Sequence, residues 1–275
     1  MSKIGEKGDK MINIAIIGGT GVYDPSILKN VYEDKMMTPY GEVTYKAGEY
    51  ASKKVAFIPR HGSNHSIPPH LINYRANIWA IKKMGVTDII ATTAVGSLNE
   101  QMKPGDFVLV DQFLDFTKNR ISTFYEGGEK GVVHLDVTEP YCPNLRSLIE
   151  VAARELNFSS HNGGVYVCTD GPRFETPAEV KMFAQLGGDL VGMTNVPEVV
   201  LAHEAEMCYA TISMVTNFAA GISPQVLTHT EVLEIMAENA EKIKKLIMRS
   251  IEKIDIQENS CKCRAMLSEY GGFKL

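Results

Sequence analysis

The sequence predicts an α/β fold, in which a single domain has a central mixed, largely parallel β-sheet flanked by helices. Two observations lead to this prediction. Short apolar runs of strand length alternate along the chain with amphipathic stretches of helical length. No linker-like stretch divides the 275 residues, and no internal repeat is present. We expect one domain over residues 11–255, a flexible polar N-terminus at residues 1–10 and a tail at residues 256–275.

The expected strands are the apolar runs at residues 12–17, 55–59, 87–93, 107–111, 164–169, 189–193 and 207–216. The expected helices place apolar side chains at helical spacing, and they are residues 72–84, 144–156, 177–186 and 230–254. The last helix starts with a glutamate and gathers lysines toward its end, which suits the helix dipole.

Composition and charge exclude several classes of protein. With 28 Lys+Arg, 33 Asp+Glu, 44% hydrophobic and 22% charged residues, the chain has a net charge of −5 and an ordinary globular composition. It is neither a disordered chain nor a basic nucleic-acid binder. It contains no apolar run long enough for a membrane span or a signal peptide. We expect a soluble, cytoplasmic protein with no nucleic-acid or membrane partner.

The five cysteines do not predict a disulfide scaffold. Cys142, Cys168 and Cys208 stand singly, and we interpret each as a small, free core residue. Cys261 and Cys263 form a Cys-Lys-Cys pair in the polar tail. Exposed thiols, a redox-active or inter-subunit disulfide and adventitious metal binding all remain open for this pair. Two cysteines are too few for a closed zinc site, so we expect no metal site.

The stretch Gly18-Gly19-Thr20-Gly21 follows the first expected strand and is a type of turn that binds anions through backbone N–H groups. It is not a dinucleotide fingerprint, because Asp24 stands where the third glycine is required, and no P-loop lysine follows. A phosphate site and a plain tight turn both remain open.

Pro59-Arg60-His61-Gly62 lies where the second expected strand ends, and open α/β sheets bind ligands at such carboxyl ends. Arg60 offers a planar fork for an oxyanion, and a surface salt bridge is the alternative. His61, His65 and His70 do not predict a metal site. A glycine and two prolines between them prevent a helix from aligning them, and no nearby carboxylate or cysteine completes a shell.

Further strand ends offer small, hydroxylated, aromatic, carboxylate and amide groups, although each alone could be an ordinary loop. They are residues 92–97, 171–176, 192–198 and 216–218. Together they predict a pocket for a small ligand with an anionic part and a planar part. Hydrolase motifs such as G-x-S-x-G and H-E-x-x-H are absent from the sequence.

Taken together, these strand ends resemble the trimeric purine nucleoside phosphorylase and methylthioadenosine phosphorylase family, from Ile14 to about Ile254. The diagnostic stretches are residues 16–21, 59–62, 73–80, 171–176 and 193–198. The resemblance implies a nucleoside phosphorylase-like fold and a homotrimer or homohexamer. It also implies attack of phosphate on C1′ of a purine nucleoside, giving a free purine and an α-pentose 1-phosphate. No cofactor is implied, because inorganic phosphate is a co-substrate.

The resemblance also implies residue roles. The phosphate-binding positions are Thr20, Arg60, His61, Thr93, Thr194 and, through its backbone, Ala94. The nucleoside-binding positions are Phe174, which stacks on the base, Met193, which packs on the ribose, and His134, which comes from a neighbouring subunit. The expected catalytic residues are Asn217, His61 and Arg60.

Two sets of residues resemble different subfamilies. The framework is the adjacent Arg60-His61 pair and the stretch 73–80, and the pocket is the set of expected base and 5′ positions. The framework is similar to that of methylthioadenosine phosphorylases, whose aspartates accept from a 6-amino group. Here Asn217 and Ala219 replace both aspartates, and an amide can donate to a 6-oxo group. Glu175 can accept from N1–H, and His229 lies where nucleoside phosphorylases bind the 5′-hydroxyl. We favour inosine and guanosine. Methylthioadenosine or methylthioinosine phosphorylase and a non-catalytic nucleotide-binding protein are the alternatives.

Overall fold

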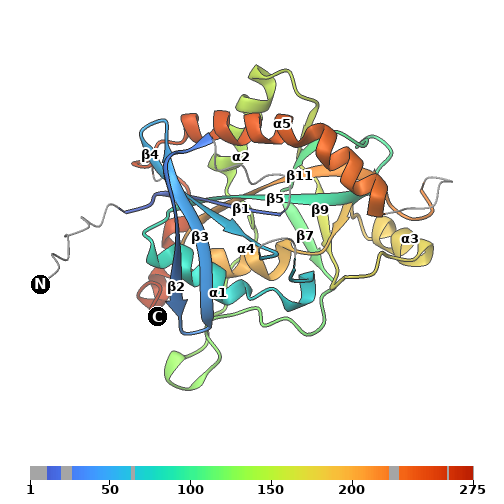
Figure 1. The fold of residues 1–275 in the computed structure, drawn as a ribbon. Helices are drawn as coiled ribbons and strands as arrows, with labels where there is room; N and C mark the ends of the chain where they lie inside the picture. The colour runs from blue at the N-terminus through green and yellow to red at the C-terminus, as the bar shows by residue number, and fades with distance from the viewer. Residues whose placement is uncertain (1–10, 20–26, 63–65, 223–228, 259, 275) are drawn as a thin grey trace, which may run out of the picture.

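The computed structural model describes residues 11–19, 27–62, 66–222, 229–258 and 260–274. Within these ranges eleven strands form one sheet (Figure 1). The strands are β1 (Ile14–Gly18), β2 (Lys29–Thr38), β3 (Gly41–Tyr50), β4 (Lys53–Pro59), β5 (Asp88–Ser97), β6 (Phe107–Leu109), β7 (Gln112–Asp115), β8 (Ser160–Asn162), β9 (Val165–Cys168), β10 (Leu190–Gly192) and β11 (Cys208–Phe218). The α-helices are α1 (Tyr74–Lys83), α2 (Pro143–Glu155), α3 (Pro177–Gln185), α4 (Asn195–Glu204) and α5 (His229–Lys253).

The sheet is mixed and largely parallel, as the sequence predicts. Its strand order is β2-β3-β4-β1-β5-β10-β9-β7. A second branch starts at β5 and has the order β5-β11-β6-β8. Strands β4, β1, β5 and β11 run parallel to one another, whereas β2, β3 and β4 form antiparallel pairs. The four parallel strands therefore share a carboxyl edge, where they end, and an amino edge, where they begin.

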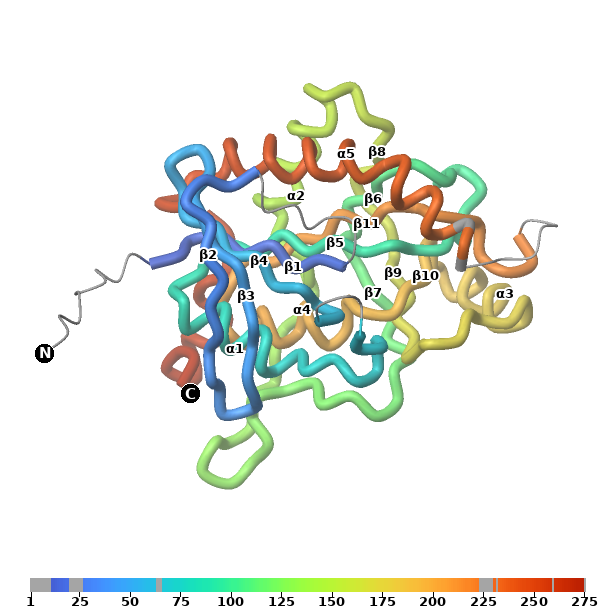
Figure 2. The backbone as a smooth tube through the Cα atoms, in the orientation of Figure 1, coloured from blue at the N-terminus to red at the C-terminus, as the bar shows by residue number. Residues whose placement is uncertain are grey.

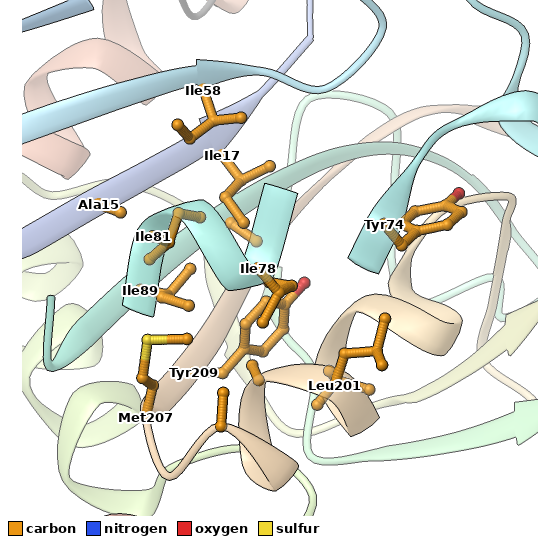
Figure 3. Close-up of a cluster of buried hydrophobic side chains, with 14 of the residues drawn as sticks. Ala15, Ile17, Ile58, Tyr74, Ile78, Ile81, Ile89, Leu201, Met207 and Tyr209 are labelled. Atoms are coloured by element: carbon orange, nitrogen blue, oxygen red, sulfur yellow. The ribbon is translucent and has the colours of Figure 1, made fainter. Parts of the chain in front are cut away.

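Helices cover both faces of this sheet. In Figures 1 and 2, α2 and α5 lie above the sheet and α1 and α4 lie below it. Ile17, Ile78 and Leu201 belong to the buried cluster on the lower side (Figure 3). Ile16 belongs to the cluster on the upper side, beside Leu246 of α5. Because neighbouring residues of β1 face opposite clusters, this strand is buried on both faces, which explains its unbroken apolar run.

All seven expected strands and four expected helices are present, with bounds that differ by a few residues. The structure adds β2, β3, β7, β8 and α4. Strand β2 is an edge strand with mostly exposed, polar side chains, so it carries no apolar pattern. Helix α4 is buried almost all round and lacks the polar face of an amphipathic helix. The alternative that residues 192–198 form only an ordinary loop is therefore wrong, because α4 begins at Asn195.

The cysteines differ from the sequence interpretation in one respect. All five are free, and Cys142, Cys168 and Cys208 are buried as expected. However, Cys142 and Cys208 do not stand singly in space, because they lie beside the Cys261–Cys263 pair. Cys263 is buried and Cys261 is half-buried, so the alternative of two exposed thiols is wrong for this pair.

The C-terminal segment, residues 256–258 and 260–274, is fastened to the domain. Arg264 Nη2 donates to Asp88 Oδ2 at 2.8 Å, and the Glu206 carboxylate accepts from the backbone N–H of Leu267 at 3.0 Å and of Phe273 at 3.1 Å. The expected flexible N-terminus, residues 1–10, lies outside the described ranges. Over the ranges that are described, every helix is too short or too polar to cross a membrane.

Candidate active site

A cavity of about 570 Å³ opens at the carboxyl edge of the sheet. The structure brings nine of the predicted site residues together on its walls: Arg60, His61, Thr93, Ala94, Phe174, Glu175, Met193, Thr194 and Asn217. Arg60, His61 and Asn217 lie at the ends of β4 and β11, as expected for a ligand site of an open α/β sheet. Thr93 and Ala94 lie within β5, and the remaining four residues follow β9 and β10.

Three predicted residues are not placed in this cavity. Thr20 and the His229 side chain lie outside the described parts of the chain. Gly19 does line the cavity, and the role of the 18–21 turn stays a prediction. His134 is exposed and does not line the cavity of its own chain.

Arg60 is held by a buried ion pair directly after β4. Its Nε and Nη2 donate to the two carboxylate oxygens of Glu198, each at 2.7 Å. Nη1 donates to the Thr92 carbonyl at 2.8 Å, and Nη2 reaches the Ile17 carbonyl at 3.5 Å. Four of the five guanidinium N–H groups are thereby used. Among the described residues the second Nη1 hydrogen has no acceptor, so it can point at a ligand.

Arg60 and Glu198 form a buried ion pair whose two charges cancel. The side chains of Arg60 and Glu198 are 2% and 0% exposed, so the alternative of a surface salt bridge is wrong. Burial by itself lowers the pKa of the guanidinium, but the charge and hydrogen bonds of Glu198 outweigh it and raise the pKa above its usual value. An anion in this cavity therefore meets one directed N–H of Arg60 rather than an uncompensated positive charge.

Glu198 is the main residue that sequence reasoning missed. In the sequence Glu198 is only the last residue of the strand-end stretch 192–198, with no role assigned to it. The available signal is a glutamate within the otherwise apolar run of residues 196–202, because a charge in a buried helix requires a partner. Tyr209 completes the arrangement by donating to Glu198 Oε1 at 2.8 Å.

Hydroxyl and imidazole groups surround the Arg60 side of the cavity. The His61 Nδ1–H donates to the Ile67 carbonyl at 2.9 Å, which orients the ring. The Thr93 and Ser213 hydroxyls lie 2.9 Å apart. Thr194 is the N-cap of α4, but the Val196 N–H in the first turn donates to the Cys168 sulfur at 3.4 Å and Pro197 has no N–H. The groups that suit phosphate here are therefore the His61 ring and the Thr93 and Thr194 hydroxyls.

The same cavity is also lined by an amide, Asn217, and a carboxylate, Glu175. Glu175 accepts from the Thr169 hydroxyl at 2.7 Å, and burial raises the pKa of its carboxyl even though this hydrogen bond acts to lower it. Asn217 Oδ1 accepts from the Thr216 hydroxyl at 2.7 Å, and Nδ2 donates to the Phe218 carbonyl at 2.9 Å. The β11–β5 register shifts between Val215 and Asn217, and such bulges aim side chains beside active sites.

Two apolar side chains, Phe174 and Met193, also line the cavity. Phe174 is 40% exposed at the cavity, which leaves a ring face available for stacking. Met193 fits against Gly171, whose φ of +63° and lack of a Cβ both favour glycine, because a Cβ there would overlap the Met193 sulfur.

Arg120 is a second residue that sequence reasoning missed. Its side chain is 4% exposed. Nη1 donates to the Val196 carbonyl at 2.6 Å, and Nη2 donates to the Thr169 and Asp170 carbonyls, each at 3.1 Å. Arg120 therefore ties the end of β9, which leads to Glu175, to the start of α4. No sequence motif marks it.

Helix α5 closes the cavity with an apolar wall made by Val232, Leu233 and Met236. The expected 5′-binding residue His229 begins this helix. In its described part, α5 therefore presents methyl groups and a thioether to the cavity.

Comparisons with known proteins agree with this geometry. The family described as "Phosphorylase superfamily" matches residues 13–252. A protein of Moorella thermoacetica named "Probable 6-oxopurine nucleoside phosphorylase" is 60% identical over 253 residues, 92% of this chain and 96% of the relative. The "6-oxopurine nucleoside phosphorylase" of Pyrococcus furiosus is 54% identical, over 94% of this chain and 98% of the relative.

Solved structures agree as well. The methylthioadenosine phosphorylase from Schistosoma mansoni in complex with adenine superposes with a TM-score of 0.88 at 34% identity, over 94% of this chain and 96% of that chain. The resemblance seen in the sequence is thus confirmed by sequence and by fold. The chain belongs to the phosphorylase superfamily.

Proposed function

We propose that this protein cleaves the N-glycosidic bond of 6-oxopurine nucleosides, inosine and guanosine, with phosphate as the nucleophile. The products are the free purine and α-ribose 1-phosphate. The observation that carries the proposal is that one cavity is lined by Asn217 and Glu175, which suit a 6-oxopurine, and also by Arg60, His61 and Thr194, which suit phosphate. The names of the relatives from Moorella thermoacetica and Pyrococcus furiosus support it.

At the phosphate end, the free N–H of Arg60, the His61 ring, the Thr93 and Thr194 residues, the Ala94 backbone and Thr20 hold the nucleophile below the sugar. Phosphate oxygen attacks C1′ as the C1′–N9 bond breaks, with inversion at C1′. Because the transition state resembles an oxocarbenium ion, the phosphate charge stabilises it most when donors hold that charge in place.

At the base end, the electron pair of the broken bond moves onto the purine, which takes a proton from solvent at N7. The Asn217 amide accepts from N7–H and donates to the 6-oxo group. The Glu175 carboxylate accepts from N1–H and from the 2-amino group of guanine, while Phe174 stacks on the ring. A 6-aminopurine would leave the Asn217 donor facing an amine, which a buried site rejects strongly.

We propose that the chain works as a homotrimer or homohexamer in which His134 of a neighbouring subunit completes the ribose site with Met193 and His229. In support, His134 is exposed on a segment that also exposes the apolar side chains of Ile121 and Val132.

A methylthio-nucleoside substrate is the second candidate. The apolar wall formed by Val232, Leu233 and Met236 suits a 5′-methylthio group. Asn217 suits a 6-oxopurine, so methylthioinosine fits this candidate better than methylthioadenosine. His229 favours a 5′-hydroxyl, and for that reason we place inosine and guanosine first.

We propose no cofactor, no nucleic-acid or membrane partner and a cytoplasmic location. The net charge of −5 supports the lack of a nucleic-acid partner. A non-catalytic nucleotide-binding protein would require a broken phosphate set, whereas Arg60, His61 and Thr194 all line one cavity.

The test is release of hypoxanthine from inosine with and without phosphate, with ³¹P NMR detection of ribose 1-phosphate. We expect both products, and only when phosphate is present. His61→Ala should lower kcat/KM by about 10²-fold, the usual cost of one lost transition-state donor. His161→Ala is the matched control, because His161 bonds Asp106 away from the cavity. Release of free ribose without phosphate would contradict the proposal.

A further inference from the structure

Four of the five cysteines converge at the amino edge of the sheet. The Sγ atoms of Cys142, Cys208, Cys261 and Cys263 all lie within 4.8 Å of one another. Cys142 is the N-cap of α2 and Cys208 is the first residue of β11, whereas Cys261 and Cys263 belong to the C-terminal segment. We call these four residues the cysteine cluster.

The cysteine cluster is separate from the candidate active site. Cys208 pairs in register with Asp88 at the start of β5, whereas Asn217 pairs with Gly96 near the end of that strand. In Figures 1 and 2 the C-terminus lies at the opposite side of the molecule from α3, which follows Glu175. None of the four cysteines lines the large cavity.

The sulfurs are gathered and largely shielded from solvent. Cys142, Cys208 and Cys263 are 0%, 3% and 4% exposed, and Cys261 is half-buried. The Cys208 and Cys261 sulfurs lie 3.4 Å apart. In a tetrahedral zinc–thiolate site the metal–sulfur distance of about 2.3 Å places sulfurs roughly 3.8 Å apart. The cluster therefore needs only small side-chain adjustments to reach that geometry.

The surroundings suit a charged metal–thiolate centre. Cys142, Cys208 and Cys261 line a cavity of about 20 Å³ that Asp88 and Arg264 also line, and about 10–15 Å³ suffices for one water-sized occupant. Four thiolates around a divalent cation leave a charge of −2. The Arg264 charge is paired with Asp88, but its buried Nε–H, which has no other hydrogen-bond partner among the described residues, can donate to a thiolate.

We propose that the cysteine cluster binds one thiophilic divalent cation, with zinc as the expected ion, in a closed four-thiolate site that fastens the C-terminal segment to α2 and β11. Binding replaces four S–H bonds by four metal–sulfur bonds and releases four protons. The site has no open position for substrate, so its role is structural. For the cysteines, the sequence expectation of no metal site counted only Cys261 and Cys263 as neighbours, and the fold adds Cys142 and Cys208.

Two disulfides are the competing use of the same thiols. Disulfide formation needs the sulfurs to approach in separate pairs. In this cluster all four sulfurs lie within 4.8 Å of one another, and the Cys208 and Cys261 sulfurs are 3.4 Å apart, well beyond the disulfide bond length of about 2.05 Å. Such mutual convergence is what a single central ion requires.

The test begins with the full-length protein, expressed with zinc in the medium and purified anaerobically without chelators. Elemental analysis should find one zinc, or another thiophilic divalent ion, per chain. A thiol reagent should label the four cluster cysteines only after a chelator removes the metal. After exchange with Co²⁺, the protein should show thiolate-to-cobalt charge-transfer bands and the intense visible bands of a tetrahedral site.

The variants separate the cluster from the fifth cysteine. The double variant Cys261→Ser/Cys263→Ser should lose at least about tenfold in metal content, as loss of ligands does. Cys168→Ala is the matched control and should keep one ion per chain, because Cys168 is buried outside the cluster. Circular dichroism verifies that each variant is folded.

Three results would overturn the proposal. They are wild-type protein with four reactive thiols and no metal, two disulfides detected by mass spectrometry of the unreduced protein, and a double variant that keeps the wild-type metal content. Inosine phosphorolysis is measured separately. The cluster does not line the active-site cavity, so failure of one proposal leaves the other standing.

Discussion

The two edges of the sheet each hold a buried arginine–carboxylate pair, but in different settings. At the carboxyl edge, Arg60 and Glu198 are 2% and 0% exposed and adjoin a cavity of about 570 Å³. At the amino edge, Arg264 and Asp88 are 16% and 5% exposed and adjoin four cysteines and a cavity of about 20 Å³. Beside the large cavity, an arginine–carboxylate pair can orient a ligand. Beside the small cavity, the same kind of pair can only hold two segments of the chain together.

The largest expected effect comes from breaking the pair at the carboxyl edge. Glu198→Ala leaves the Arg60 charge buried without a partner, which costs about 3–5 kcal/mol of unfolding free energy. Urea unfolding measures this loss, and inosine phosphorolysis should fall with it. Glu155→Ala removes an exposed partner of Arg249 and should cost less than about 1 kcal/mol. Equal stability of the two variants would contradict the role of Glu198.

The second expected effect concerns base choice at the same edge. Asn217→Asp replaces an amide donor by a carboxylate that accepts from a 6-amino group. The ratio of kcat/KM for inosine to that for adenosine should fall by about 10²-fold, the scale on which unpaired polar groups discriminate. Steady-state kinetics with both nucleosides measures the ratio. An unchanged ratio would remove Asn217 from base recognition.

A smaller effect is expected at the amino edge. Asp88→Ala removes the partner of Arg264, which keeps some contact with solvent, so the loss should be about 1–3 kcal/mol. Values of kcat/KM below the unfolding temperature should not change, because Asp88 does not line the active-site cavity. A drop in kcat/KM without unfolding would show that the two edges are coupled.

The smallest effect is a shift in a pH profile. Burial raises the pKa of Glu175, so protonation abolishes its acceptor role at a higher pH than for an ordinary glutamate. The kcat/KM for guanosine should therefore decline as pH falls through this raised pKa, and Glu175→Gln should flatten that limb. Glu179→Gln is the control, because Arg173 lowers the pKa of Glu179 to about 2. A profile that Glu175→Gln leaves unaltered would contradict the assignment.

Sequence patterns predicted the carboxyl edge better than the amino edge, for a physical reason. Parallel strands bring their ends together, so residues such as Arg60, Thr93 and Asn217 could be assigned to one site before the fold was known. Cys142 and Cys208 follow no such rule, because their approach to the tail depends on how α2, β11 and the C-terminal segment pack.

The misses within the active site have a related cause. Glu198 lies on α4, whose uniform burial hides the helical period, and Arg120 acts through backbone carbonyls that no sequence motif specifies. Strand β2 was missed because an exposed edge strand needs no apolar face. Sequence patterns identify side chains whose position follows from the period of a helix or strand. They miss residues such as Glu198 and Arg120, whose roles depend on tertiary contacts.

The most direct test is a parallel measurement of kcat/KM for inosine, guanosine, adenosine and methylthioadenosine with phosphate in excess. Asn217 and Glu175 predict that inosine and guanosine have the highest values and that no purine is released without phosphate. A large preference for methylthioadenosine, or release of purine without phosphate, would contradict the account.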